Sequence, residues 1–206
     1  MKIYDVEGFP NPARVRIALA EKGVSGKVQF IPVDVMKGEH RMPDFLKKNP
    51  SAAVPVLELD DGTFISECTA ITEYIDGAFD GTPLCGRTPK ERATIHMMQR
   101  RAEARVSDAV GAYFHHATPG LGPLLETHQN KEWGLRQKEI AIQGMLYFND
   151  VLAHQPYVAG DQFSMADITL FAGLAFADYA KIDIPAECVN LIRWREKVSA
   201  RPAFAG

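Results

Sequence analysis

The stretch from residue 54 to residue 76 constrains the fold of this chain more than any other. It opens with Val54-Pro55, continues as two short apolar runs separated by Asp61-Gly62, and reaches a helical pattern at Ser66-Glu67. A proline at the start of a strand cannot donate to the sheet, so it lies at an edge or a bulge, and an X-Pro bond is the one peptide bond for which the cis form is inexpensive. An Asp-Gly pair between apolar runs predicts a tight hairpin. The stretch therefore predicts a strand edge that one hairpin joins to the start of a helix.

This arrangement predicts a docking site for an extended peptide that carries a carboxylate. Val54 is expected to be extended, with its backbone N–H and C=O available to a partner outside the sheet. The N-terminus of a helix attracts anions, because its first N–H groups lack intrahelical partners. The helix that follows the hairpin has an acidic first turn and apolar residues at helical spacing, at Ile71, Tyr74, Ile75 and Phe79.

Charge and cysteine content narrow the possible partners. The 206 residues carry a net charge of −3, so the chain has no basic field that would favour nucleic acid or an anionic membrane. No window approaches the roughly 18 uninterrupted apolar residues of a membrane span, and the N-terminus has the pattern of a strand rather than of a signal peptide. The three cysteines are widely spaced, which predicts reduced thiols and a cytoplasmic protein.

Residues 1–80 alternate strands and helices in the order β-α-β-α-β-β-α, which predicts an α/β domain of the thioredoxin-like type. Asn11 is expected to be the N-cap of the first helix, with Pro12 as its first residue. Strands are expected at 3–6, at 28–33 and within the hairpin at 54–66, and helices at 12–23, 43–48 and 67–79.

The second part of the chain is expected to be entirely helical. Residues 81–89 are rich in Gly, Pro and Thr, which is typical of a linker, and the helical domain is expected at 90–206. Ser164 and Asp167 have the spacing of a capping box, in which each residue satisfies a backbone N–H of the other. Helices are expected at 90–112, 131–153, 165–181 and 186–200.

These residues resemble the cytosolic glutathione S-transferase family over essentially the whole chain. The resemblance rests on segments 14–19, Asn49-Pro50 with Val54-Pro55, Glu67-Cys68, and the Ser164–Asp167 box. Segments 37–40 and 114–122 are similar to a fungal and bacterial subgroup that lacks the usual catalytic tyrosine, serine or cysteine. The resemblance implies an N-terminal thioredoxin-like glutathione domain, an all-helical C-terminal domain, a homodimer, and glutathione as co-substrate.

The resemblance also implies how glutathione binds. The γ-glutamyl carboxylate is expected on the N–H of Cys68, the ammonium on Glu67, and the cysteinyl backbone on Val54, with Pro55 shaping the turn. His40, with Lys37 as a second candidate, is expected at the glycine carboxylate. Each feature has a purely structural alternative: an acidic residue favours any helix N-terminus, and a loop histidine is commonly just solvated. The family usually has serine where Cys68 stands, and a thiol is the weaker donor.

The glutathione thiol must also be activated. A free thiol has a pKa near ~8.5, and lowering it by about 2 units requires about 2.7 kcal/mol of preferential thiolate stabilisation. Part of this thiolate stabilisation is expected from the start of the first helix, through the N–H groups of Ala13 and Arg14. The resemblance implies His115, directly or through water, as the remaining group, with Tyr4 and Asn11 as alternatives. No metal is expected, because no other His or Cys stands at ligand spacing.

Three functions remain open at this point. The first is a glutathione transferase that attaches the thiolate to small hydrophobic electrophiles in detoxification. The second is a non-catalytic interaction module on the same fold, and the third is a glutathione-dependent isomerase or peroxidase. Departures from the family pattern keep the second alternative open, at Phe9, Ala53, Cys68 and Gly111.

Overall fold

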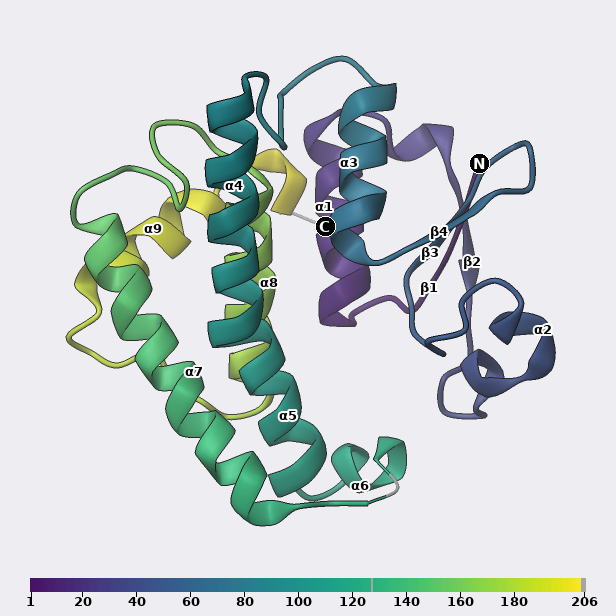
Figure 1. The fold of residues 1–206 in the computed structure, drawn as a ribbon. Helices are drawn as coiled ribbons and strands as arrows, with labels where there is room; N and C mark the ends of the chain where they lie inside the picture. The colour runs from purple at the N-terminus through teal and green to yellow at the C-terminus, as the bar shows by residue number, and fades with distance from the viewer. Residues whose placement is uncertain (127, 205–206) are drawn as a thin grey trace. The chain divides into compact units, whose positions relative to one another are not determined.

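The computed structural model describes residues 1–126 and 128–204. The chain forms two compact units, Met1–Leu84 and Cys85–Gly206. Figure 1 shows strands only in the first unit, with helices beside them, whereas the second is built of helices. The predicted fold class, a thioredoxin-like α/β domain followed by a helical domain, is confirmed.

The first unit is built on a mixed four-stranded sheet with the order β2-β1-β3-β4. Strands β1 and β2 are parallel, and the other neighbours are antiparallel. The predicted element order is confirmed; β1 has the expected length but begins one residue earlier, and the other strands are shorter than expected. The strands are β1 Lys2–Asp5, β2 Gln29–Pro32, β3 Val56–Glu58 and β4 Phe64–Ser66.

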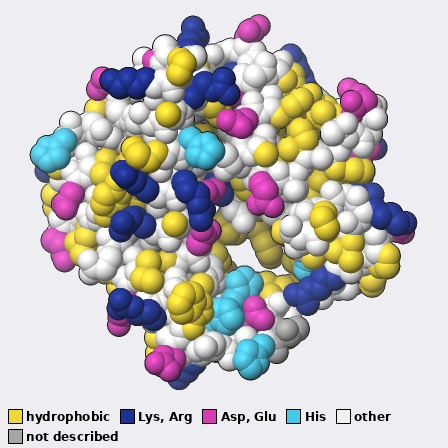
Figure 2. All heavy atoms as spheres, viewed as in Figure 1, with side chains coloured by type: hydrophobic (Ala, Val, Ile, Leu, Met, Phe, Trp, Pro, Cys, Tyr) yellow, Lys and Arg dark blue, Asp and Glu magenta, His cyan; other side chains and the backbone are white. Residues whose placement is uncertain are grey.

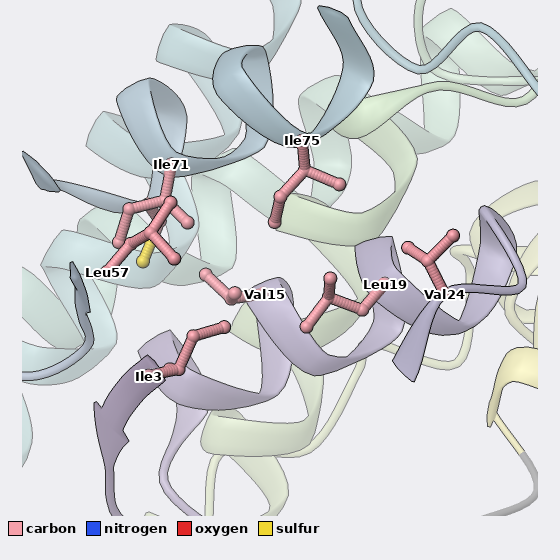
Figure 3. Packing of buried hydrophobic residues seen from close by; sticks show 8 residues of the cluster. Ile3, Val15, Leu19, Val24, Leu57, Ile71 and Ile75 are labelled. Atoms are coloured by element: carbon pink, nitrogen blue, oxygen red, sulfur yellow. The ribbon is translucent and has the colours of Figure 1, made fainter. Parts of the chain in front are cut away.

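Two helices pack together on one side of this sheet. Helix α1 covers Pro10–Glu21 and helix α3 covers Cys68–Ala78, and short α2 spans Pro43–Leu46. Figure 3 shows their apolar side chains meeting those of the strands. The cluster is almost fully buried, so removing water from it stabilises the unit; its members are Ile3, Val15, Leu19, Val24, Leu57, Cys68, Ile71 and Ile75.

A buried ion pair fixes the far ends of the two helices. The ammonium of Lys22, the C-cap of α1, lies 2.9 Å from Oδ1 of Asp76 on α3, and it also donates to the Thr82 carbonyl at 3.2 Å. The same Asp76 oxygen accepts from the N–H of Leu84 at 3.0 Å. Removing one partner of a buried pair leaves an uncompensated charge, so this cluster holds α1, α3 and the segment after α3 in one arrangement.

The prediction that Asn11 caps α1 is wrong. The N-cap is Phe9, in an extended conformation, and Asn11 is already the second helical residue. A residue before proline is biased towards an extended backbone, and both Phe9 and Asn11 precede one. Since Pro10 is suited to the first helical position, the helix begins two residues earlier than the second proline suggested.

The second unit is helical, as expected, but its first long helix differs from the prediction. A single helix was expected at 90–112. The structure instead has two α-helices joined by a π-helical turn at Glu103–Ser107, and the second of them ends at Ala117. The α-helices are α4 Pro89–Ala102, α5 Asp108–Ala117, α6 Leu121–Leu125, α7 Lys131–Leu152, α8 Met165–Tyr179 and α9 Val189–Ser199. None of the described helices is long and apolar enough to cross a membrane.

The predicted capping box at the start of α8 is confirmed, and it does more than cap. The fully buried Asp167 carboxylate accepts from Ser164 through both its N–H and its Oγ, at 3.0 and 3.1 Å. It also accepts from the N–H of Val158 at 2.9 Å and from Nε1 of Trp194 at 3.0 Å. One side chain therefore joins the loop before α8, α8 itself and α9.

This burial has a measurable pH signature. Burial raises the pKa of the Asp167 carboxyl from its ordinary 3.8 to about 6, against the effect of its hydrogen bonds. The folded state therefore favours the protonated carboxyl. The contribution of Asp167 to the free energy of unfolding is fully present below pH 4, and it is lost as the pH rises through about 6. Asp167→Asn has the same shape and does not titrate. We expect the free energy of unfolding of the wild type, relative to Asp167→Asn, to fall by about 2 kcal/mol from pH 4 to pH 7 in urea titrations. A difference that stays constant over this range would contradict the assignment.

Candidate functional site

Four segments of the first unit meet at one end of its sheet. Strands β1 and β2 are parallel and both end there, so residues 6–9 and 33–40 leave the sheet at the same edge. Strand β3 enters at this edge and β4 leaves it, since Tyr4 pairs with Val56 and Val56 pairs with Ser66. The register therefore brings Val54-Pro55 next to Glu67-Cys68, as the hairpin pattern predicted.

The segment before β3 is held by a buried amide. The Val54–Pro55 bond is cis and Pro55 is buried. Asn49, only 2% exposed, donates from Nδ2 to the Ala53 carbonyl at 2.8 Å and accepts from the N–H of Ser51 at 3.1 Å. This side chain fixes the loop that presents the Val54 backbone. We did not assign Asn49 to the site from the sequence, although an Asn-Pro pair is a turn signal.

The start of α3 has an unusual backbone conformation at Glu67. Its φ is 70°, a left-handed value that costs a non-glycine residue about 1–3 kcal/mol. Glu67 is the N-cap of α3, and its side chain makes no capping hydrogen bond and lies exposed. The exposed carboxylate is therefore available beside the positive end of the helix.

Cys68 faces the interior rather than the loops. Its thiol donates to the Asn11 carbonyl over 3.3 Å and lies in the buried cluster between α1 and α3. The family usually has serine at this position, and the structure shows what the cysteine side chain contacts instead. In this structure the thiol links the starts of the two helices, and an apolar neighbourhood suits it better than a hydroxyl.

The start of α1 offers fewer donors than expected. Pro10 and Pro12 have no N–H, and the N–H of Ala13 donates to the Phe9 carbonyl at 2.9 Å. The expectation that Ala13 presents a free N–H is thus wrong, because the helix starts earlier. Arg14 is the fifth helical residue and lies beyond the turn whose N–H groups lack intrahelical partners. Among residues 10–13, only Asn11 has a backbone N–H that lacks a hydrogen-bond partner within the described residues.

His40 lies at this edge with an unsatisfied ring nitrogen. The side chain is 8% exposed, and its buried Nδ1 has no hydrogen-bond partner within the described residues. Burial, aided by the nearby charge of Arg41, lowers the pKa of His40, so the imidazole is neutral at pH 7. Lys37, the second candidate for this role, is highly exposed and pairs with Asp34 at 3.0 Å.

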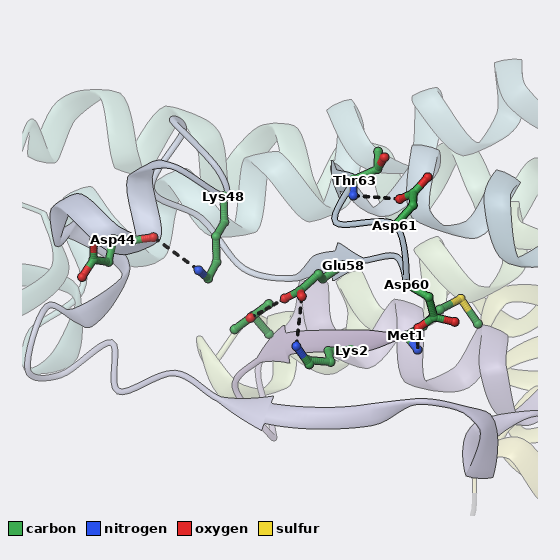
Figure 4. A network of polar contacts seen from close by, with 9 residues as sticks. Met1, Lys2, Asp44, Lys48, Glu58, Asp60, Asp61 and Thr63 are labelled. Carbon is green, nitrogen blue, oxygen red and sulfur yellow. Dashed lines mark hydrogen bonds and ion pairs between the residues drawn. The ribbon is translucent and has the colours of Figure 1, made fainter.

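Tyr4 has a partner that competes with a catalytic role. Its hydroxyl donates to Glu58, which also accepts from Lys2 at 2.9 Å (Figure 4). Burial and the Glu58 carboxylate raise the pKa of Tyr4 to about 12. Donation from Tyr4 to a thiolate would require this hydrogen bond to break.

His115 belongs to the second unit, in the last turn of α5. Burial lowers the pKa of His115, and the charge of Glu126 partly offsets this, so the ring is neutral at pH 7. Its backbone carbonyl accepts from Nε2 of Gln129 at 2.6 Å, while the neighbouring His116 accepts the N–H of Asn130 on Nδ1 at 3.2 Å. The two histidines thus differ: His116 helps to hold the start of α7, whereas the ring nitrogens of His115 have no hydrogen-bond partner within residues 1–126 and 128–204.

No three His, Cys, Asp or Glu side chains are grouped to hold a metal ion in the part of the chain that the structure describes. The arrangement in the first unit instead provides an extended backbone, a helix start with an adjacent carboxylate, and a buried neutral imidazole. These groups are suited to a peptide-like ligand that has both an ammonium and carboxylates.

Known proteins match the chain along nearly its whole length. Residues 10–78 match the glutathione S-transferase N-terminal domain, and residues 107–202 match the C-terminal domain. Glutathione S-transferase 2 of Saccharomyces cerevisiae is 60% identical over 204 residues, which cover 98% of this chain and 87% of that protein. The crystal structure of Gtt2 from the same yeast superposes with a TM-score of 0.95, covering 99% of this chain and 98% of that one.

A bacterial structure is equally similar. A glutathione S-transferase domain-containing protein of Marinobacter aquaeolei is 63% identical, with a TM-score of 0.97 over 99% of this chain and all of the other. Both domain matches and these relatives agree with the fold. The chain belongs to the glutathione S-transferase family.

Proposed function

We propose that the protein is a glutathione transferase that attaches the glutathione thiolate to small hydrophobic electrophiles. The observation that carries the proposal is the hairpin register, in which the Val56–Ser66 pair sets the Val54 backbone beside the start of α3. The 60% identity with a yeast glutathione S-transferase supports the same reaction class.

Each part of glutathione has a proposed partner in the first unit. The γ-glutamyl carboxylate binds the N–H of Cys68 at the start of α3, and its ammonium binds the exposed Glu67 carboxylate. The cysteinyl backbone pairs with Val54 as an added strand does. His40 donates an N–H of its ring to the glycine carboxylate, which is supported by its buried Nδ1, a nitrogen without a hydrogen-bond partner among the described residues.

Thiolate stabilisation is proposed to come from two sources. The positive end of α1 contributes through its dipole and the N–H of Asn11. A neutral His115 contributes as hydrogen-bond partner or, through water, as the base that takes the thiol proton. The lowered pKa of His115 supports this role, because the imidazole then remains uncharged and able to accept a proton at neutral pH.

A second candidate is a glutathione-dependent isomerase on the same scaffold. A maleylacetoacetate isomerase of Pseudomonas aeruginosa is 29% identical over 99% of this chain and 93% of that protein. Both reactions use the same bound thiolate, and they differ in whether the thiol stays on the product. Release of unchanged glutathione after turnover of a cis-alkene diacid would favour the isomerase.

We further propose a cytoplasmic homodimer that acts in detoxification. None of the three cysteines forms a disulfide within the described residues, as expected in a reducing compartment. The family relationship supports the dimer, and sedimentation equilibrium measures it directly: a single species near the 22.8 kDa chain mass would contradict the proposal.

Conjugation of 1-chloro-2,4-dinitrobenzene across pH 5.5–9 tests the reaction and His115 together. We expect glutathione-dependent turnover whose pH profile reports a thiol pKa below the ~8.5 of a free thiol. His115→Ala should raise that apparent pKa and lower the rate at pH 6.5 by about tenfold or more, with glutathione affinity nearly unchanged. His116→Ala is the matched control. An unchanged profile in His115→Ala would reject the role of His115, and retention on immobilised glutathione without turnover would favour a binding module.

Two neighbouring substitutions separate side-chain from backbone contacts at the start of α3. Glu67→Gln should weaken glutathione binding by about tenfold, because a charged hydrogen bond to the ammonium is lost. Cys68→Ala should leave the dissociation constant within about twofold, since its N–H remains, while lowering the free energy of unfolding by about 1 kcal/mol. Titration calorimetry and urea unfolding measure the two effects. A tenfold affinity loss in Cys68→Ala would show that the thiol itself binds the ligand.

The role of His40 is tested by a ligand that lacks the glycine charge. We expect His40→Ala to raise the KM for glutathione by about tenfold, and His40→Gln to raise it less because an N–H donor is retained. With the ethyl ester of the glycine carboxylate, the wild type and His40→Ala should have similar KM values. An equal effect of His40→Ala on both ligands would instead mean that His40 supports the loop and does not contact the carboxylate.

A further inference from the structure

The residues just before α7 are tied to the last turn of α5, the turn that carries His115. Nε2 of Gln129 donates to the His115 carbonyl at 2.6 Å, and the N–H of Asn130 donates to Nδ1 of His116 at 3.2 Å. The side chain of Asn130 in turn caps α7. The start of α7 is therefore anchored at two points to the end of α5.

Two glycines bring α6 and α7 close to the same turn. A Cβ at Gly122 of α6 would overlap the Phe114 carbonyl, and one at Gly134 of α7 would lie 2.7 Å from Cβ of Ala117. Both helices thus approach the end of α5 more closely than a residue with a side chain would allow. Glu126 follows α6 directly, so this packing holds it near the two histidines of α5.

The Glu126 carboxylate lies among histidines. Its Oε1 accepts from the N–H of His128 at 3.1 Å, and its Oε2 lies 3.9 Å from Nε2 of His116, which is too long for a hydrogen bond. Because Nδ1 of His116 already accepts the Asn130 N–H, the proton of its neutral ring is on Nε2, the nitrogen that faces Glu126. Figure 2 shows His side chains gathered around an acidic one at the lower end of the helical unit.

The charge of Glu126 acts on the ring of His115. Among the charged groups of the described residues, Glu126 and His116 are the two that shift the pKa of His115, and Glu126 raises it against the lowering effect of burial. The ring of His115 also lies edge-on to Phe114, with 5.3 Å between the centroids. On the neighbouring elements, charged side chains have other partners, as for Glu103 of the π-helical turn with Arg100, Lys138 of α7 with the Tyr113 ring, and Asp178 of α8 with Arg195.

We propose that Glu126 is a positioning residue for the transferase reaction, and that its carboxylate stabilises the imidazolium which His115 becomes when it takes the thiol proton. In this step the S–H bond of glutathione breaks, the electron pair stays on sulfur, and the proton forms an N–H bond on the His115 ring, directly or through water. A carboxylate close to the ring favours the charged product of this transfer. Glu126 acts through His115, so the inference rests on the proposed function of that histidine.

An NMR titration of the full-length protein without glutathione tests the coupling apart from activity. The ring signals of isotope-labelled histidines are followed with pH, and the His115 signal is assigned as the one missing in His115→Ala. We expect Glu126→Gln to lower the pKa of His115 by about half a unit or more, because one nearby negative charge is lost. Glu132→Gln removes an exposed carboxylate from the first turn of α7 and is the matched control. Equal His115 pKa values in Glu126→Gln and the wild type would reject the proposal.

Conjugation of 1-chloro-2,4-dinitrobenzene then tests whether the coupling serves the reaction. Glu126→Gln should lower the rate at pH 6.5 by about threefold, the equivalent of half a pKa unit, and move the pH profile upward with the KM for glutathione unchanged. In the His115→Ala background the same substitution should have no further effect. A rate loss that is equal at every pH, or that persists in His115→Ala, would mean that Glu126 only supports the fold.

The two measurements separate this inference from the proposed function. An unchanged His115 pKa in Glu126→Gln, together with a slow His115→Ala, rejects Glu126 alone. A shifted pKa together with a fully active His115→Ala rejects the role of His115, and the role of Glu126 in the reaction with it. If Glu126→Gln fails to fold, as judged by circular dichroism melting, Glu126→Asp draws the charge back by one methylene. A smaller fall in the His115 pKa is then the expected result, and an unchanged value contradicts the proposal.

Discussion

The pairing of Val56 with Ser66 is the constraint on which the first unit depends. It aligns β3 with β4, and through β4 it sets where α3 begins. A shift of one residue would move every side chain of the hairpin to the opposite face of the sheet. It would also separate the Val54 backbone from the start of α3, because these lie immediately outside the paired residues. The same register therefore serves core packing and the candidate glutathione site.

The core behind the hairpin accounts for one departure from the family pattern, the cysteine at position 68. Cys68 opens α3, packs among apolar side chains and contacts the Asn11 carbonyl at the start of α1. At the other ends of the same helices, Lys22 and Asp76 form a buried pair. The helix starts that line the site are thus fixed from both ends, and a left-handed Glu67 is kept in place by the structure around it.

In the second unit, too, a few buried contacts fix the positions of the helices. Asp167 gathers three elements through one carboxylate, and glycines allow the π-helical turn to lie close to α7 and α8. A Cβ at Gly173 would lie 2.7 Å from Oγ of Ser107, just as one at Gly144 would meet Arg105. Close backbone approach at these positions sets how the π-helical turn packs against α7 and α8.

Local signals in the sequence determined much of this protein. The Asp61-Gly62 hairpin, the order of strands and helices, and the Ser164–Asp167 box each rest on contacts within a few residues, and all are present in the structure. The tertiary structure decided the remaining features of the fold and the site. These features depend on which of several segments, far apart in the chain, a residue contacts. Pro10 and Pro12 both suit the first helical position, and the prediction placed the start of α1 at the wrong one. The π-helical turn has no local signature. The partners of Tyr4 and Cys68, and the burial of His40, likewise depend on segments that only folding brings together.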